Sequence, residues 1–142
     1  MIYRSKAPLR IGLAGGGTDV SPYCDLYNGA ILNATLSLYA YATLEVLDEP
    51  VIELHAWDQG DHLVYEMQDQ LPIDGKLDLL KGVYNRVRND YGIPAKGLRL
   101  STYVDASAGS GLGTSSTLVV AIVGVFAEML KLPLGEYDMA HY

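Results

Sequence analysis

Residues 114–131 constrain the fold most, because this helix-length stretch is apolar on nearly all sides. A helix without a polar face is stable only when other elements surround it, so we expect it at the centre of the fold. Its most apolar part, residues 118–130, is too short to span a bilayer and contains Glu128. The stretch therefore predicts a buried central helix in a soluble domain.

The composition excludes several classes of protein. A chain of 142 residues, 49% apolar and 19% charged, is typical of one globular domain. Its formal net charge of −7 disfavours nucleic acid and anionic membranes as partners. Cys24 is the only cysteine, so no intrachain disulfide forms, and no apolar stretch follows the N-terminal charges as in a signal peptide. We therefore expect a cytoplasmic protein.

Hydrophobic periodicity predicts a mixed succession of elements. β-forming residues predict strands, a Gly-containing turn predicts a hairpin, and apolar residues at helical spacing predict a helix that Gly92 and Pro94 end. The predicted outer face of this helix carries Lys81, Arg86, Arg88 and Asp90. The predicted elements are strand 10–14, two adjoining strands within 30–47 broken near Ser37, hairpin 51–55 with 62–66, helix 80–91, strand 97–104 and helix 114–131. This order favours an α+β fold with a mixed or antiparallel sheet.

A loop of small residues precedes the central helix and carries the strongest functional signal. Gly109, Gly111 and Gly113 allow positive φ and close approach to a ligand, and the following hydroxyl residues open the helix. Unpaired N–H groups and the helix dipole there favour phosphate, and a hydroxyl there can ligate Mg²⁺. The alternative is an ordinary flexible loop with a Ser or Thr cap. A Walker A loop is excluded because the segment has no lysine, and a dinucleotide fingerprint is excluded because Thr114 stands where glycine is needed.

Two motifs in the right order resemble those of the GHMP kinases. Residues 109–117, Gly-Ser-Gly-Leu-Gly-Thr-Ser-Ser-Thr, resemble the family's P-x-x-x-G-L-G-S-S-A loop, with Ser107 in place of the proline and Thr114 in place of the first serine. Residues 7–19, from Ala7-Pro8 to Thr18-Asp19, resemble the A-P-G-R-x-x-L-x-G-E-H-x-D block of the sugar kinases, except for Leu9 and the triple glycine. The triple-glycine form looks most like the D-glycero-D-manno-heptose 7-phosphate kinases, with the fucokinase domain as a relative.

The resemblance implies a fold and a reaction. The fold would be the N-terminal, ATP-binding GHMP domain, ribosomal protein S5 domain 2-like, over residues 1–142. The reaction would be Mg²⁺- and ATP-dependent phosphorylation of a sugar or sugar phosphate, with heptose 7-phosphate at C1, for GDP-heptose biosynthesis, as the first expectation. Fucose or a galactose-like sugar is the alternative. The family's general base, an acidic Mg²⁺ ligand and a second domain lie beyond the second motif, so we expect a truncated, inactive piece whose exposed apolar surface leads to homodimers. The alternative function, of a different class, is a non-catalytic nucleotide-binding or interaction domain.

Residue roles also follow from the resemblance. Arg10 would be catalytic and stabilise the charge of the transferred phosphoryl group, although a solvated strand-end arginine is the plainer alternative. The sugar would be bound by Gly15, Gly16, Gly17, Thr18 and Asp19, although aspartate after glycines is also common in turns. The ATP phosphates would be bound by Gly109, Ser110, Gly111, Leu112, Gly113, Thr114, Ser115 and Ser116. Ser115 would also ligate Mg²⁺.

Several other residues carry weaker signals. Arg4 and Lys6 are candidate contacts for a phosphate on the sugar, although basic residues near a terminus are usually only solvated. Trp57 is more typical of packing than of adenine stacking. The histidines 55, 62 and 141 show no metal-ligand spacing, and no role is assigned to them.

Overall fold

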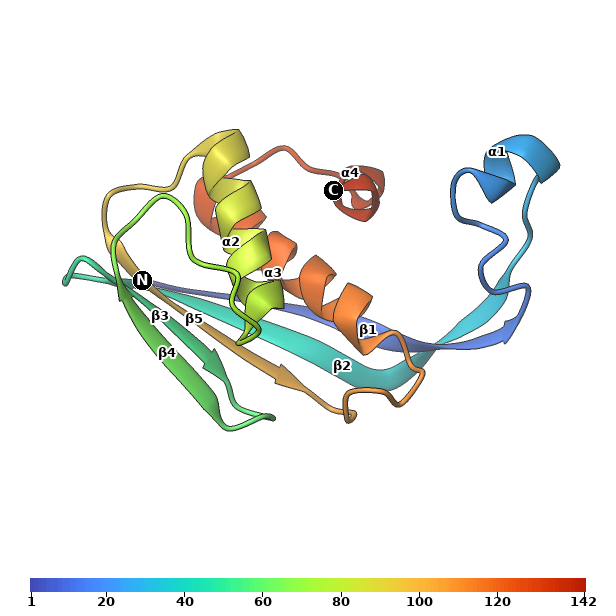
Figure 1. Cartoon of the computed structure of the whole chain (residues 1–142), viewed down its shortest axis with the longest axis horizontal. Helices are drawn as coiled ribbons and strands as arrows, with labels where there is room; N and C mark the ends of the chain where they lie inside the picture. The colour runs from blue at the N-terminus through green and yellow to red at the C-terminus, as the bar shows by residue number, and fades with distance from the viewer.

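The computed structural model describes residues 1–142 as one sheet with helices on one of its faces (Figure 1). The elements along the chain are β1 (Ile2–Ala14), α1 (Tyr23–Tyr27), β2 (Leu32–Leu47), β3 (Val51–Ala56), β4 (Asp61–Glu66), α2 (Asp78–Tyr91), β5 (Gly97–Val104), α3 (Thr114–Leu130) and α4 (Glu136–His141). The short helix α1 was not predicted. None of the helices combines the length and the apolar character needed to cross a membrane.

The sheet has the strand order β1-β2-β5-β3-β4 and is mixed. β3 runs parallel to β5, and every other neighbouring pair is antiparallel. This confirms the predicted α+β class. One boundary prediction was wrong, because β1 begins at Ile2. β2 is one continuous strand, but its pairing with β1 is interrupted between Thr35 and Tyr39, around the break predicted near Ser37. The two strands pair along almost their whole length, and the irregularities lie in their register, between Pro8 and Arg10 and between Gly12 and Ala14.

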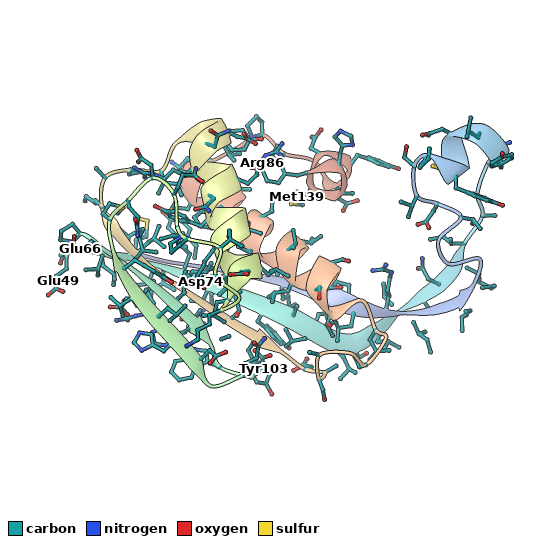
Figure 2. All side chains as sticks on the ribbon, viewed as in Figure 1. Glu49, Glu66, Asp74, Arg86, Tyr103 and Met139 are labelled. Carbon is teal, nitrogen blue, oxygen red and sulfur yellow. The ribbon has the colours of Figure 1, made fainter.

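Helix α2 follows the predicted range closely, but one residue that was predicted on its outer face lies on its buried face. Lys81, predicted on the outer face, is fully buried. Its Nζ donates to Asp74 Oδ1 at 2.6 Å, in the loop before α2 (Figure 2). The ammonium group also lies 5.6 Å from the centre of the Tyr65 ring. Periodicity alone places a lysine outside, and the carboxylate of Asp74 in the loop leading into the helix allows this one inside.

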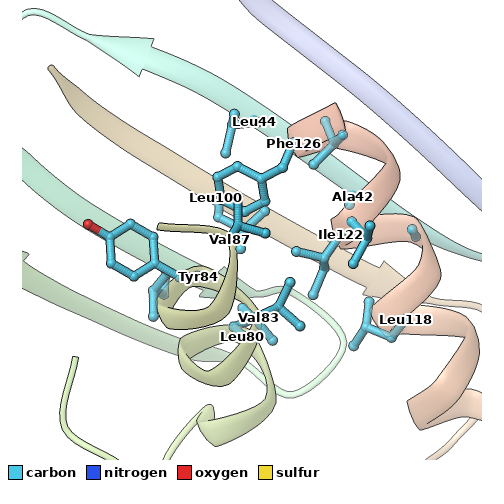
Figure 3. Close-up of a cluster of buried hydrophobic side chains, with 14 of the residues drawn as sticks. Ala42, Leu44, Leu80, Val83, Tyr84, Val87, Leu100, Leu118, Ile122 and Phe126 are labelled. Carbon is cyan, nitrogen blue, oxygen red and sulfur yellow. The ribbon is translucent and has the colours of Figure 1, made fainter. Parts of the chain in front are cut away.

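The core lies between the sheet and helices α2 and α3. Figure 3 shows apolar side chains from both helices meeting those of β2 and β5. The α3 side chains Leu118, Ile122 and Phe126 are buried, which confirms the prediction of a central helix. Two of the inward positions on β2 are small, since Ala40 and Ala42 are buried there beside Leu44. Small side chains let α3 pack against β1 and β2, and this packing fixes where the first turn of α3 lies.

Candidate active site

The loop before α3 has the backbone geometry of an anion-binding turn. Gly109, Gly111 and Gly113 have φ of 80°, 76° and 70°, a region that side chains disfavour. Gly113 caps α3 and offers no side chain to its first N–H groups. The first helical hydrogen bond to this cap runs from Thr117 N to Gly113 O at 3.0 Å. The preceding N–H groups of the first turn therefore have no partner within the helix and are available to a phosphate.

A cavity of about 250 Å³ adjoins this turn. Thr114, Ser115 and Leu118 of α3 form one wall, and the first turn of α2 forms another. The turn between β3 and β4 contributes Asp58 and Gln59. Apolar walls that end at a helix N-terminus suit a flat heterocycle carrying phosphates. The sequence predicted the β3–β4 hairpin but gave no signal that its turn reaches this cavity.

Arg10 lies directly against the glycine loop, about a hundred residues away in sequence. Its backbone N–H donates to Leu112 O at 3.1 Å. Its guanidinium packs against Gly113 so closely that a Cβ added there would lie 2.7 Å from Nη1. Arg10 also lines a second, smaller cavity with Ser116 and Thr117. The predicted catalytic residue and the predicted phosphate loop therefore form one site.

The triple glycine lies at the tip of the β1–β2 pair. Gly15 is required for packing, because it has φ of 76° and an added Cβ would lie 1.9 Å from Ala30 O. Gly16 and Gly17 face open space, and an added Cβ at either would contact nothing. Asp19 is exposed. This tip offers bare backbone and one exposed carboxylate to a ligand.

Thr18, whose contact with the sugar stays a prediction, makes hydrogen bonds within its own loop that the sequence did not predict. Its Oγ1 donates to Gly15 O at 2.7 Å and accepts from Ala30 N at 3.1 Å. These bonds hold the loop closed, and they leave at most one lone pair for a ligand. We therefore assign Thr18 to holding the loop in shape.

The two motifs lie at the same end of the molecule. In Figure 1 the paired strands β1 and β2 extend beyond the helices as an arm that carries residues 15–30, including α1. The N-terminus of α3 faces the same end as this arm. Arg10 lies where the arm leaves the body of the sheet, beside the glycine loop. The fold thus places the guanidinium of Arg10 between the glycine loop before α3 and the arm that carries the triple glycine.

Comparison with known proteins identifies the domain. Residues 78–142 match the family model for the GHMP kinases N terminal domain. A D-glycero-alpha-D-manno-heptose 7-phosphate kinase from Campylobacter jejuni is 49% identical over 137 residues, which are 96% of this chain and 40% of that protein. The chain carries a GHMP kinase N-terminal domain. This confirms the family predicted from the two motifs.

Solved structures agree with this assignment. A D-glycero-D-manno-heptose 1-phosphate kinase from Bacteroides thetaiotaomicron superposes with a TM-score of 0.92 at 55% identity, covering 99% of this chain and 46% of that one. Galactokinase from Lactococcus lactis superposes with a TM-score of 0.77 at 18% identity and shares the fold. The chain therefore spans under half the length of the GHMP kinases that it matches.

Proposed function

We propose that the protein to which this chain belongs transfers the γ-phosphoryl group of ATP to a hydroxyl of a sugar or sugar phosphate. The observation that carries this proposal is the contact of Arg10 with the glycine loop, at the base of the arm that carries residues 15–30. A guanidinium between an anion-binding turn and a polar tip is placed to stabilise a phosphoryl group in transit.

ATP would bind with its base in the cavity beside α3 and its phosphates on the first turn of that helix. The cavity wall is apolar at Leu77, Leu80 and Leu118, and hydroxyl groups lie at its α3 end. Ser115 offers an exposed hydroxyl there, and Asp58 lines the same cavity with a carboxylate, so the donor set fits Mg²⁺. When bound, Mg²⁺ would neutralise phosphate charge.

The transfer itself is a displacement at phosphorus. The sugar hydroxyl oxygen forms a bond to the γ-phosphorus while the bond to the β–γ bridging oxygen breaks, and ADP leaves with the electron pair. The hydroxyl proton is lost to a base or to water. In this chain Arg10 would stabilise the equatorial oxygens, and the N–H groups of α3 would hold the β- and γ-phosphates. Asp19 would orient the sugar by accepting hydrogen bonds from its hydroxyls.

For the substrate, we propose D-glycero-D-manno-heptose 7-phosphate, phosphorylated at C1 as a step toward GDP-heptose. Its support is the 49% identity to a heptose 7-phosphate kinase over nearly the whole chain. A bacterial L-fucokinase/L-fucose-1-P guanylyltransferase is only 26% identical, which makes fucose the weaker alternative. Gly16 and Gly17 leave room for a seven-carbon sugar to lie against the backbone.

We also propose the cellular location and the partners of this enzyme. A net charge of −7 and a small-molecule site favour a cytoplasmic enzyme whose partners are ATP and a sugar phosphate, without nucleic acid or membrane. Self-association into a homodimer is a further proposal, which rests on the apolar arm.

The test is a coupled ADP-release assay on the whole protein with heptose 7-phosphate, fucose and galactose. We expect turnover that depends on Mg²⁺, prefers the heptose and falls by about a hundredfold or more in Arg10→Ala. Asp19→Ala should raise KM for the sugar, while Glu66→Gln on the far edge strand serves as the matched control. Nucleotide binding without transfer to any of these sugars would instead support a non-catalytic nucleotide-binding domain.

A further inference from the structure

The β3–β4 hairpin brings three potential metal ligands together on the side of the sheet that faces away from the helices. His55 on β3 is paired directly with His62 on β4. Glu53 lies two residues before His55, so both side chains project from the same face. The alternate residues Ile52 and Leu54 are buried in the core, which assigns Glu53 and His55 to the outer face.

The three ligand atoms lie close enough together that a rotation of one exposed side chain would bring them onto one ion. One nitrogen or carboxylate oxygen from each of Glu53, His55 and His62 lies within 4.8 Å of the others. His55 Nε2 and Glu53 Oε2 are 3.6 Å apart, close to the edge of about 3.3 Å of a tetrahedron built from zinc–ligand bonds of about 2.0–2.1 Å. His55 Nε2 is also shielded from solvent and has no hydrogen-bond partner. An orphaned nitrogen beside a carboxylate and a second imidazole is an arrangement that a metal ion would satisfy.

We propose that Glu53, His55 and His62 bind a divalent transition-metal ion of the zinc class, with water as the fourth ligand. Two imidazoles and one carboxylate are donors typical of Zn²⁺, whereas Mg²⁺ and Ca²⁺ prefer oxygen alone. The centres of the two imidazole rings are 3.9 Å apart and their planes are inclined by 30°, so we expect His62 to turn for both nitrogens to reach one ion. His62 is exposed and can make this turn, while His55 packs against Trp57 with ring centres 5.2 Å apart.

The surrounding charges support binding of a cation. Arg99 donates from Nε to Glu53 Oε2 at 2.6 Å and from Nη1 to Glu45 Oε2 at 2.8 Å. Two carboxylates thus face one guanidinium, which leaves the cluster with one excess negative charge when both histidines are neutral. Arg99 also fixes the orientation of the Glu53 carboxylate, as hydrogen-bond partners of metal ligands commonly do.

The location of the site indicates what the ion would do. β4 is an edge strand that pairs only with β3, so the ion would clamp the edge of the sheet. The turn between His55 and His62 contains Asp58 and Gln59, which line the cavity beside α3. The metal would therefore stabilise the hairpin that forms one wall of this cavity.

The experiment treats the chain with a chelator and then titrates it with Zn²⁺ in a calorimeter. His62→Gln is the test variant, and His141→Gln on α4 is the matched control. We expect one ion per chain in the wild type and the control, and affinity reduced by about tenfold or more in His62→Gln. Because His62 is exposed, the variant should fold, and unchanged circular dichroism would establish that it does. Saturable binding that His62→Gln leaves unchanged, or no saturable binding to the wild type, would overturn the proposal.

Co²⁺ provides a second readout that reports on geometry. Low-symmetry coordination by two imidazoles and a carboxylate should give visible d–d absorption in the wild type and in His141→Gln. The absorption should be lost in His62→Gln and in His55→Gln. Zinc should also raise the melting temperature of the wild type and not that of His62→Gln, since only a folded hairpin assembles the site. An equal rise in both proteins would count against these ligands.

Discussion

Gly113 is the residue at which the phosphate loop and Arg10 meet. It has φ of 70°, and a Cβ added there would lie 2.7 Å from Arg10 Nη1. We expect Gly113→Ala to lower kcat/KM of the whole protein by about a hundredfold, because the new methyl group displaces the guanidinium in addition to straining the turn. The assay is the ADP-release measurement described above.

Gly111→Ala is the matched control for this change. Gly111 has φ of 76°, but nothing lies within 4 Å of an added Cβ there, so it shares the strain and lacks the collision. We expect its activity loss to be clearly smaller than that of Gly113→Ala. Equal losses in the two variants would mean that backbone strain alone matters and that Arg10 is not positioned by this contact.

A second residue-level prediction concerns acid stability. The hydrogen bond from Lys81 holds the pKa of Asp74 below its ordinary value of 3.8, so the ion pair stabilises the fold above that pH and loses its effect as pH falls through the lowered pKa. Asp74→Asn should therefore lower the melting temperature most at neutral pH, and the deficit should shrink below about pH 4. Thermal melts from pH 7 to pH 3, with Glu66→Gln as control, measure this difference. A deficit independent of pH would exclude the ion pair as its cause.

At the residue scale the sequence predicted those roles that local motifs carry. Arg10 and Gly113 were found because each belongs to a motif with fixed spacing. The roles of Thr18 and Lys81 were not predicted, because each depends on how the neighbouring loop folds back onto the residue. The cluster of His55 and His62 was missed for the same reason, since their pairing depends on the register of the hairpin.

At the scale of elements, two helical glycines differ in what surrounds them. Gly82 on α2 is exposed, and an added Cβ there would touch nothing within 4 Å. Gly82→Ala should stabilise the protein by about 0.5–1 kcal/mol, because alanine loses less backbone freedom in a helix. An added Cβ at Gly124 on α3 would lie 2.7 Å from Ser5 Oγ on β1. Gly124→Ala should therefore be less favourable than Gly82→Ala by about 1 kcal/mol or more.

Chemical denaturation of Gly82→Ala, of Gly124→Ala, of Ser5→Ala and of the double variant Ser5→Ala/Gly124→Ala tests this contact. Removing the Ser5 hydroxyl should restore most of the gain expected for alanine at position 124, which a double-mutant cycle would record as coupling. If Gly82→Ala and Gly124→Ala gain equally, α3 does not pack against β1 as closely as the structure indicates.

Most helices and strands could be predicted from periodicity, but the residues at which several of them begin or end could not. Helix α3 was predicted to within one residue because its apolar character and its glycine cap are local features. The full length of β1 was missed, because its first residues carry alternating polar and basic side chains whose strand geometry comes from pairing with β2. The five-residue α1 was missed because so short a helix has too few turns to show periodicity.

At the scale of the whole molecule, the arm formed by β1 and β2 carries apolar side chains that nothing in the chain covers. Leu13, Leu26, Leu32 and Val20 each expose 59% or more of their surface. Figure 1 shows that neither α2 nor α3 lies over this part of the sheet. The resemblance to longer kinases predicted exposed apolar surface only in general terms, and the fold places part of it on the arm that also holds the triple glycine.

Because exposed apolar surface gathered on one part of a molecule associates in water, residues 1–142 should form dimers or larger species as concentration rises. Leu26→Glu should shift this association to higher concentration, since a charge on the arm cannot be buried without cost. Ile73→Glu is the matched control: Ile73 is similarly exposed, at 60%, but lies in the loop before α2, away from the arm. Light scattering coupled to gel filtration should give the same rising mass for the wild type and for Ile73→Glu. A constant monomer mass in the wild type would contradict the prediction, and a loss of association in Ile73→Glu alone would move the interface from the arm to the α2 side.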